Sequence, residues 1–237
     1  MGNIGSFDGD ILYPRFQRSA RDEGDSGPNT GGMGAYSPAP VVTPALHQSI
    51  MDKIIYPTIK AMKAEGMPYT GFLYAGLMIT PDQGAKVLEF NCRLGDPETE
   101  PLLLRLKSDL VELCLAALEK RLQHYEIAWD PRPALGVVLA ATGYPFQYPQ
   151  GDIIRGLPTH NLEDCKIFHA GTAWQDHHIV TAGGRVLCVT ALGNNFHEAK
   201  TKVYTEVAKI NWINKYYRSD IGYRALQRER TNEYGNS

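Results

Sequence analysis

Apolar residues recur every three or four positions between Thr43 and Gly66, and this spacing predicts an amphipathic helix. Thr43 suits the N-cap position, and Pro44 fits the first turn, where a helix leaves its N–H groups unbonded. Pro57 should kink the helix midway, and Gly66 should end it. The apolar stripe of this helix is therefore expected to face a hydrophobic core.

Two β-rich runs follow at residues 71–80 and 85–91, with Pro-Asp-Gln-Gly between them. A short turn-forming segment between two such runs predicts a β-hairpin. Helical patterns return at residues 101–107, and then from an N-cap at Ser108 through Leu122.

The pattern changes after a linker at residues 125–133, which contains two prolines. Short apolar runs then predict strands, and a longer amphipathic run predicts a helix at residues 196–210. The predicted strands are residues 135–141, 166–173, 179–182 and 185–192, the last two joined by Gly183-Gly184. We therefore expect a first domain at 24–124 and a second, α+β domain at 134–230, preceded by an arm at 1–23 that shows no period.

The stretch from Gly24 to Pro40 has five glycines and three prolines in seventeen residues, which predicts a long loop. Glycine leaves backbone N–H groups uncovered, so such a loop allows close approach to an anion. A flexible linker is the alternative, and the stretch matches neither a Walker A loop nor a dinucleotide fingerprint. The candidate substrate- and phosphate-binding residues are Asn29, Thr30, Gly31, Gly32 and Gly34.

A second group of candidate residues lies at the end of the predicted hairpin. Side chains of a strand alternate between faces, so Glu89 and Asn91 should share one face. A carboxylate and an amide oxygen suit a hard cation such as Mg²⁺, although a solvated strand face would carry the same residues. Arg93 follows with a fork of donors that matches phosphate, and Asp96 adds an acid in the next turn.

Composition narrows the class of protein. The chain has 237 residues, 43% of them hydrophobic, with a net charge of −2 and no basic run, which argues against nucleic-acid binding. No apolar stretch is long enough to cross a membrane and no signal-peptide pattern begins the chain, so the predicted location is the cytoplasm. The cysteines lie far apart in apolar runs, so buried free thiols, rather than disulfides or zinc ligands, are expected at Cys92, Cys114, Cys165 and Cys188.

Four motifs together resemble the phosphoribosylamine–glycine ligase family, and they occur in register from about Gly24 to Arg230. Four long motifs in the same order make a chance match very improbable, whereas either glycine-containing loop alone would not. The motifs are Gly-Pro-Asn-Thr-Gly-Gly-Met-Gly-Ala-Tyr-Ser-Pro (27–38), Gly-Phe-Leu-Tyr-Ala-Gly-Leu-Met (71–78), Val-Leu-Glu-Phe-Asn-Cys-Arg-Leu-Gly-Asp-Pro-Glu (87–98) and Gly-Gly-Arg-Val-Leu-Cys-Val-Thr-Ala-Leu-Gly (183–193).

The resemblance implies an α+β fold, with the C-terminal part of an ATP-grasp catalytic domain followed by a small α+β domain. It implies ligation of glycine to 5-phosphoribosylamine through glycyl phosphate, with ATP as a substrate and Mg²⁺ or Mn²⁺ as cofactor. By position, Glu89 and Asn91 match the metal ligands of the family. Arg93 would steady the transferred phosphoryl group, the loop at 29–34 would shape the substrate side, and Asp96 or Glu98 would assist proton loss from an amine.

The chain also departs from the family, because the N-terminal domain and the ATP lid expected ahead of Gly24 have no counterpart here. This leaves three hypotheses: the ligase, a catalytically incomplete fragment of it, or a different ATP-grasp carboxylate–amine ligase. A separate chain that supplies the N-terminal half would restore the first hypothesis. Truncation further predicts an exposed apolar face and self-association.

Overall fold

The computed structural model describes residues 20–80 and 84–234, with side chains described as far as residue 230. The predicted arm at 1–23 therefore lies mostly outside the described residues. The chain forms two compact units. The described part of the first unit comprises residues 38–80, 84–95 and 106–130, and that of the second comprises residues 20–37, 96–105 and 131–234.

The predicted long helix of the first unit is present, but it is interrupted where Pro57 requires it. Helix α1 (Pro44–Ile50) continues through a π-helical turn, η2 (Met51–Ile55), into helix α2 (Tyr56–Ala64). Because Pro57 has no N–H to donate, the widened turn just before it accommodates the missing hydrogen bond. Thr43 caps the start by accepting from the N–H of Leu46 at 3.2 Å. Gly66 ends the helix with a positive φ of 79°.

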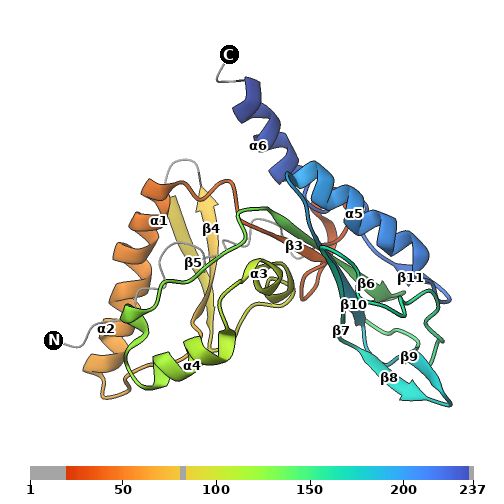
Figure 1. Ribbon diagram of the computed structural model, residues 1–237, viewed down its shortest axis with the longest axis horizontal. Helices are drawn as coiled ribbons and strands as arrows, with labels where there is room; N and C mark the ends of the chain where they lie inside the picture. Colours follow the sequence, from red (N-terminus) through yellow and green to blue (C-terminus); the bar gives the residue numbers. More distant parts are fainter. Residues whose placement is uncertain (1–19, 81–83, 235–237) are drawn as a thin grey trace. The chain divides into compact units, whose positions relative to one another are not determined.

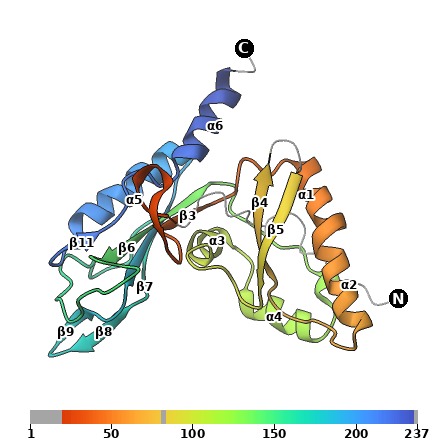
Figure 2. The ribbon, with the colours of Figure 1, turned by 180° about the vertical axis from the view of Figure 1, so that it is seen from behind.

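The predicted hairpin consists of strands β4 (Tyr74–Thr80) and β5 (Gly84–Asn91), which pair antiparallel. Helices α1 and α2 lie along one side of it in both views of the ribbon (Figures 1 and 2). A core of Ile50, Ala75 and Leu77 fills that side, as the apolar stripe predicts. The opposite side carries the residues predicted to bind metal.

The last helix of the first unit begins and ends differently from the sequence prediction. Helix α4 (Leu110–Leu118) is capped by Asp109, whose carboxylate accepts from the N–H groups of Val111 and Glu112. The predicted cap, Ser108, instead accepts from the N–H of Ala128 at 2.8 Å. An Asp in extended conformation directly before the helix outcompetes Ser108, and a separate 3₁₀ turn, η3 (Leu122–His124), follows.

The second unit is built on an antiparallel sheet whose central strands lie far apart in sequence. Strand β6 pairs with β10, β10 pairs with β7, and both β11 and β3 pair with the other edge of β6. The strands are β3 (Gly34–Ser37), β6 (Ala134–Ala141), β7 (Cys165–His169), β10 (Arg185–Leu192) and β11 (Lys215–Tyr216).

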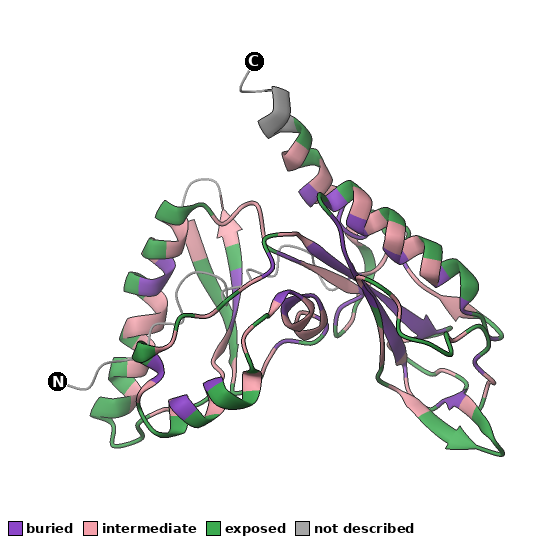
Figure 3. Cartoon of the chain, viewed as in Figure 1, coloured by how far each residue is buried: buried purple, intermediate pink, exposed green. Residues whose placement is uncertain are grey.

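Both faces of this sheet are covered, and so β6 is buried along its whole length (Figure 3). Helix α5 (Phe196–Lys209) packs on one face and helix α3 (Thr99–Arg105) on the other (Figure 1). A Cβ atom at Gly136 would lie only 3.0 Å from Oγ1 of Thr190, so this glycine makes room for the side chains of β10 beside it. Val203 and Val207 of α5 are completely buried, which confirms the predicted apolar side of that helix.

Two predictions about the strands of this unit are wrong. The predicted strand at 166–173 divides at Gly171 into β7 and a separate strand β8 (Thr172–Gln175), which forms a hairpin with β9 (His178–Thr181). A Cβ atom at Gly171 would lie only 2.6 Å from Cα of Gly183, so two chain segments cross closely there. The predicted loop at 24–40 also contains β3 and a second strand, β2 (Ser26–Asn29), which pairs with β1 (Ala20–Asp22).

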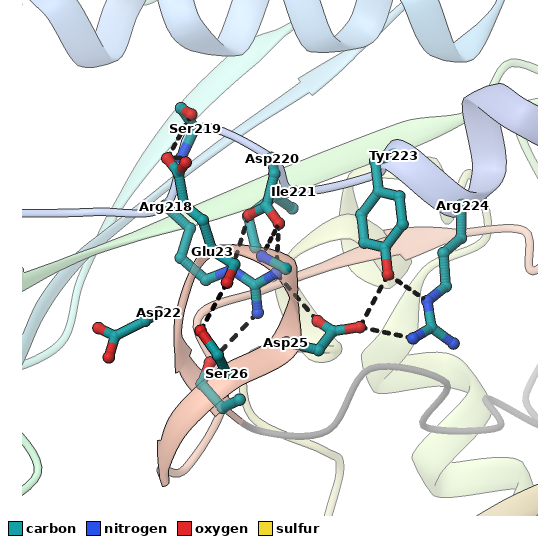
Figure 4. A network of polar contacts seen from close by, with 12 residues as sticks. Asp22, Glu23, Asp25, Ser26, Arg218, Ser219, Asp220, Ile221, Tyr223 and Arg224 are labelled. Atoms are coloured by element: carbon teal, nitrogen blue, oxygen red, sulfur yellow. Dashed lines mark hydrogen bonds and ion pairs between the residues drawn. The ribbon is translucent and has the colours of Figure 1, made fainter.

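The C-terminal segment of the second unit, which includes helix α6 (Tyr223–Tyr234), is tied to residues near the start of the described chain (Figure 4). Arg218 is only 1% exposed and contacts Asp25 and Asp220 at 2.9 and 2.7 Å through Nη2. Tyr223 and Arg224 donate to the second oxygen of Asp25. This network joins segments nearly two hundred residues apart in sequence.

The described residues include no helix long and apolar enough to span a membrane. All four cysteines are free thiols, as predicted, but the prediction that they are buried is wrong for Cys92 and for the partly buried Cys114. Cys165 and Cys188 are buried, whereas Cys92 is exposed, because it directly follows the uncovered strand β5.

Candidate functional site

Glu89 and Asn91 share the face of β5 that points away from the helices, as strand alternation predicts. Glu89 lies opposite Gly76 and Asn91 lies opposite Tyr74 in the register. A Cβ atom at Gly76 would lie 3.0 Å from Cγ of Glu89, so any larger residue there would crowd the carboxylate side chain. The glycine in β4 thus provides the space in which Glu89 lies across the sheet.

The donor set fits a magnesium or manganese ion that is shared with phosphate groups. Glu89 is exposed and Asn91 is partly buried, so their oxygens lie at the surface of the hairpin. No group of three His, Cys, Asp or Glu side chains suited to a metal occurs in the part of the chain that the structure describes. Mg²⁺ commonly takes one or two protein oxygens and completes its shell with water and substrate phosphates. These two residues can supply the protein ligands of such an ion.

Arg93 follows the strand and is exposed, and its Nη1 donates to the carbonyl oxygen of Leu94 at 2.8 Å. Because Arg93 is exposed, part of its guanidinium fork lies at the surface of the first unit. Such a group is suited to a phosphate or a carboxylate of a ligand.

The glycine loop belongs to the second unit, and its first glycines are bonded within that unit. The N–H of Gly31 donates to Oη of Tyr144 at 2.8 Å, and the N–H of Gly32 donates to Oγ1 of Thr30 at 3.1 Å. Gly34 lies in β3, where a Cβ atom would be 2.6 Å from the carbonyl oxygen of Gly136. Gly34 therefore has a packing reason to be glycine, and Asn29 is the exposed polar side chain of the loop.

Arg185 connects this loop to the acidic turn. Its Nη1 donates to the carbonyl oxygens of Gly31 at 3.1 Å, Gly32 at 3.4 Å and Asp96 at 3.0 Å. Its Nη2 donates to Oδ2 of Asp96 at 2.8 Å. The predicted residue Asp96 and the predicted loop are thus brought together by a residue that the sequence did not single out.

Glu100 lies in the first turn of α3, where the charges of Asp96 and Arg185 act on its carboxyl group. Burial raises the pKa of this carboxyl to about 7, with smaller contributions from Asp96 and Glu98 and an opposing one from Arg185. Its Oε2 atom is buried and has no hydrogen-bond partner among the described residues. A carboxyl of this kind takes up or releases a proton near neutral pH.

The predicted site residues thus fall into two sets. Glu89, Asn91 and Arg93 belong to the first unit, whereas Asp96 and the loop at 29–34 belong to the second. The sequence reasoning missed Arg185, Tyr144 and Glu100. Arg185 could have been suspected only from the Gly-Gly-Arg-Val motif at 183–186, and nothing in the sequence indicates that Tyr144 meets Gly31.

Comparison with family models identifies the class first. Residues 14–99 match the ATP-grasp (A) domain of phosphoribosylglycinamide synthetase, and residues 134–224 match its C domain. The fold is accordingly that of an ATP-grasp ligase, in which an α+β catalytic domain is followed by a small α+β domain. The two matches occur in order and together cover more than half of the chain, and the first begins ten residues before Gly24. The chain belongs to the phosphoribosylamine–glycine ligase family.

Individual relatives of the chain agree with this family assignment. The chain is 60% identical over 205 residues to the phosphoribosylamine–glycine ligase of Vibrio parahaemolyticus, covering 86% of this chain and 48% of that protein. It is also 60% identical over 212 residues to the ligase of Allochromatium vinosum, covering 90% and 50%. The chain spans about half the length of these relatives.

Solved structures show the same fold. The crystal structure of the phosphoribosylamine–glycine ligase of Thermotoga maritima matches with a TM-score of 0.72 at 37% identity, covering 86% of this chain and 50% of that one. A biotin carboxylase of Campylobacter jejuni matches with a TM-score of 0.54 at 15% identity, covering 78% and 40%. At that identity the second match shows a common fold alone.

Proposed function

We propose that the protein joins glycine to 5-phosphoribosylamine, with conversion of ATP to ADP and phosphate, in de novo purine biosynthesis in the cytoplasm. The observation that carries the proposal is the match to both domains of one ligase family, with about 60% identity to relatives named for this reaction. The order of the four sequence motifs supports the same activity.

The chemistry proposed for each residue follows from its surroundings. Glu89 and Asn91 would hold Mg²⁺ or Mn²⁺, which would neutralise phosphate charge while glycine is activated as glycyl phosphate. The exposed guanidinium of Arg93 would steady the transferred phosphoryl group. Asp96 would assist proton loss from the attacking amine, since its side chain is 54% exposed and its Oδ2 is held in place by the ion pair with Arg185.

The loop at 29–34 is proposed to shape the substrate side. The N–H groups of Gly31 and Gly32 already have acceptors within the protein, so a backbone cradle for an anion is not the basis of this role. The role would instead fall to the exposed side chain of Asn29 and to the carbonyl groups of the turn beside Arg185.

A catalytically incomplete piece of the same ligase is the second candidate. The observations in its favour are the coverage of about half of each relative and the exposed apolar residues Leu88 and Phe90 on β5, which are 57% and 41% exposed. In that case a separate chain carrying the N-terminal half would be the partner required for turnover. A different carboxylate–amine ligase of the ATP-grasp class is a third candidate, against which the 27–38 motif argues.

Release of ADP by the purified chain distinguishes these candidates. The assay contains ATP, Mg²⁺, glycine and 5-phosphoribosylamine, and each substrate is omitted in turn. Release that requires both glycine and the amine supports the ligase. Release only after the N-terminal half of a relative is added supports the incomplete piece, whereas release with another carboxylate or amine supports the third candidate.

The metal site is tested in whichever preparation is active. Glu89→Gln and Asn91→Ala should each abolish metal-dependent turnover, because the carboxylate charge or the amide oxygen is lost. Both variants should unfold at the same urea concentration as the parent, since exposed residues contribute little stability. Glu65→Gln, an exposed carboxylate in the same unit, is the matched control. Full activity in both site variants would refute the metal assignment.

A further inference from the structure

The contacts of Arg185 require the geometry of an arginine. One guanidinium group serves three backbone carbonyl oxygens and one carboxylate, and these acceptors come from two segments of the chain. A planar fork reaches such acceptors at the same time, whereas a lysine ammonium is a point charge on a flexible stem. The side chain is 20% exposed, so it is held mainly by the protein.

Both backbone polar groups of Gly31 are hydrogen-bonded to side chains. Its N–H donates to Oη of Tyr144, and its carbonyl oxygen accepts from Arg185. A Cβ atom at Gly31 would lie 2.8 Å from Cζ of Arg185, and one at Gly184 would lie 2.3 Å from Cδ2 of Tyr144. Two glycines thus make room for the two side chains that grip the loop.

The guanidinium group of Arg185 also takes part in an ion pair with the carboxylate of Asp96. The charges of Arg185, Asp96 and Glu98 all act on the carboxyl of Glu100, and Arg185 opposes the two acids there. The ion pair with Asp96 and the bonds to the loop carbonyls fix the turn and the loop to one group. The distances show that Gly31 and Asp96 approach the same nitrogen atom although they lie 65 positions apart in sequence.

We propose that Arg185 is a positioning residue of the ligase: it holds the Gly31–Gly32 loop against the Asp96 turn, so that the polar groups of both segments present one fixed surface to the substrate. This inference rests on the proposed function for its effect on turnover. The positioning itself is a property of the second unit and can be measured without turnover.

Hydrogen–deuterium exchange of the purified chain measures the positioning directly. In Arg185→Ala, amides of residues 27–34 should exchange about tenfold faster than in the parent, while amides of 187–192 in β10 stay protected. Arg185→Lys should show a smaller increase, because it retains the charge and loses the fork. Tyr144→Phe should loosen the same loop by removing the acceptor of the Gly31 N–H. Arg155→Lys, an exposed arginine of the same unit, is the control.

Unchanged exchange of the loop in Arg185→Ala would overturn the proposal. If Arg185→Ala does not fold and therefore exchanges along its whole length, the Arg185→Lys variant decides. Faster exchange confined to residues 27–34 in that variant supports the proposal, whereas unchanged exchange of these residues overturns it. In the active preparation, Arg185→Ala should lower kcat and leave KM for ATP unchanged, with part of kcat recovered in Arg185→Lys. The proposal would also be overturned if Arg185→Ala kept the full kcat of the parent while residues 27–34 exchanged faster.

The two proposals fail in different ways. Absence of ADP release from the parent preparation would refute the proposed function and leave the exchange result to decide whether Arg185 holds the loop. If the parent releases ADP normally and the Arg185 substitutions leave the exchange rates of residues 27–34 unchanged, the positioning role alone is refuted.

Discussion

Strands β5 and β6 have similar length and opposite environments. In β5, Val87, Leu88, Glu89 and Phe90 are all exposed, although three of them are apolar. In β6 all eight residues are buried between α5 and α3. The two units therefore differ in how they use β-structure: the second unit derives its stability from a covered sheet, whereas the first presents an exposed hairpin, where we propose that ligands bind.

The difference extends to the charged residues. Glu89 lies at a surface where losing its charge should scarcely affect folding. Arg218 lies inside the second unit, where two carboxylates depend on it. Changes in the second unit should therefore alter stability strongly, and changes on β5 should alter binding and association instead.

The largest effect is expected from Arg218→Ala. Removing this guanidinium leaves Asp25 and Asp220 without their buried partner, so the free energy of unfolding should fall by about 3–5 kcal/mol. Urea unfolding followed by tryptophan fluorescence measures it, because Trp212 is buried in the same unit.

Arg21→Ala provides the control, since the Arg21–Asp22 pair is about one third exposed and should contribute less than about 1 kcal/mol. Equal losses in the two variants would contradict the assignment of stability to the buried network.

A smaller effect is expected from Glu100→Gln, and it should depend on pH. Burial raises the pKa of Glu100 from 4.5 to about 7 in the folded chain. Between these values the folded state binds the proton and the unfolded state does not, so stability falls as the pH rises from about 4.5 to 7. Glutamine has no proton to lose, and the variant should be about 1–3 kcal/mol more stable than the parent at pH 8.

Urea unfolding at pH 5 and pH 8 gives the pH slope for both proteins, and Glu65→Gln serves as the exposed control. A parent whose stability does not change between those pH values would show that Glu100 is not the buried proton-binding group.

The smallest change in stability is expected from Leu88→Lys on β5. Its side chain is 57% exposed, so the free energy of unfolding should change by less than about 0.5 kcal/mol. Self-association should nevertheless decrease, because a charge is placed in an exposed apolar strand. Sedimentation velocity at several concentrations measures it, with Ile213→Lys, 70% exposed in the second unit, as the control. A parent protein that remains monomeric at high concentration would show that the exposed apolar residues of β5 do not cause self-association.

The sequence by itself determined those features that depend on neighbours along the chain. The helix from Thr43, the β4–β5 hairpin and the common face of Glu89 and Asn91 follow from local period and capping, and they are present as predicted. The family resemblance was likewise readable, because its motifs are continuous segments, and the family models confirm it.

Only the tertiary structure decided the contacts between distant segments. Strand β3 exists because residues 34–37 pair with β6, about a hundred positions later, and glycine-rich composition alone predicts a loop. Gly171 splits a run that reads as one strand, because it must pass Gly183 closely. Arg185 meets Gly31 across 154 positions, and no local pattern encodes which carbonyl a guanidinium will reach. Periodicity reports on which side of an element is buried, whereas the partner that covers it is selected by packing of the whole fold.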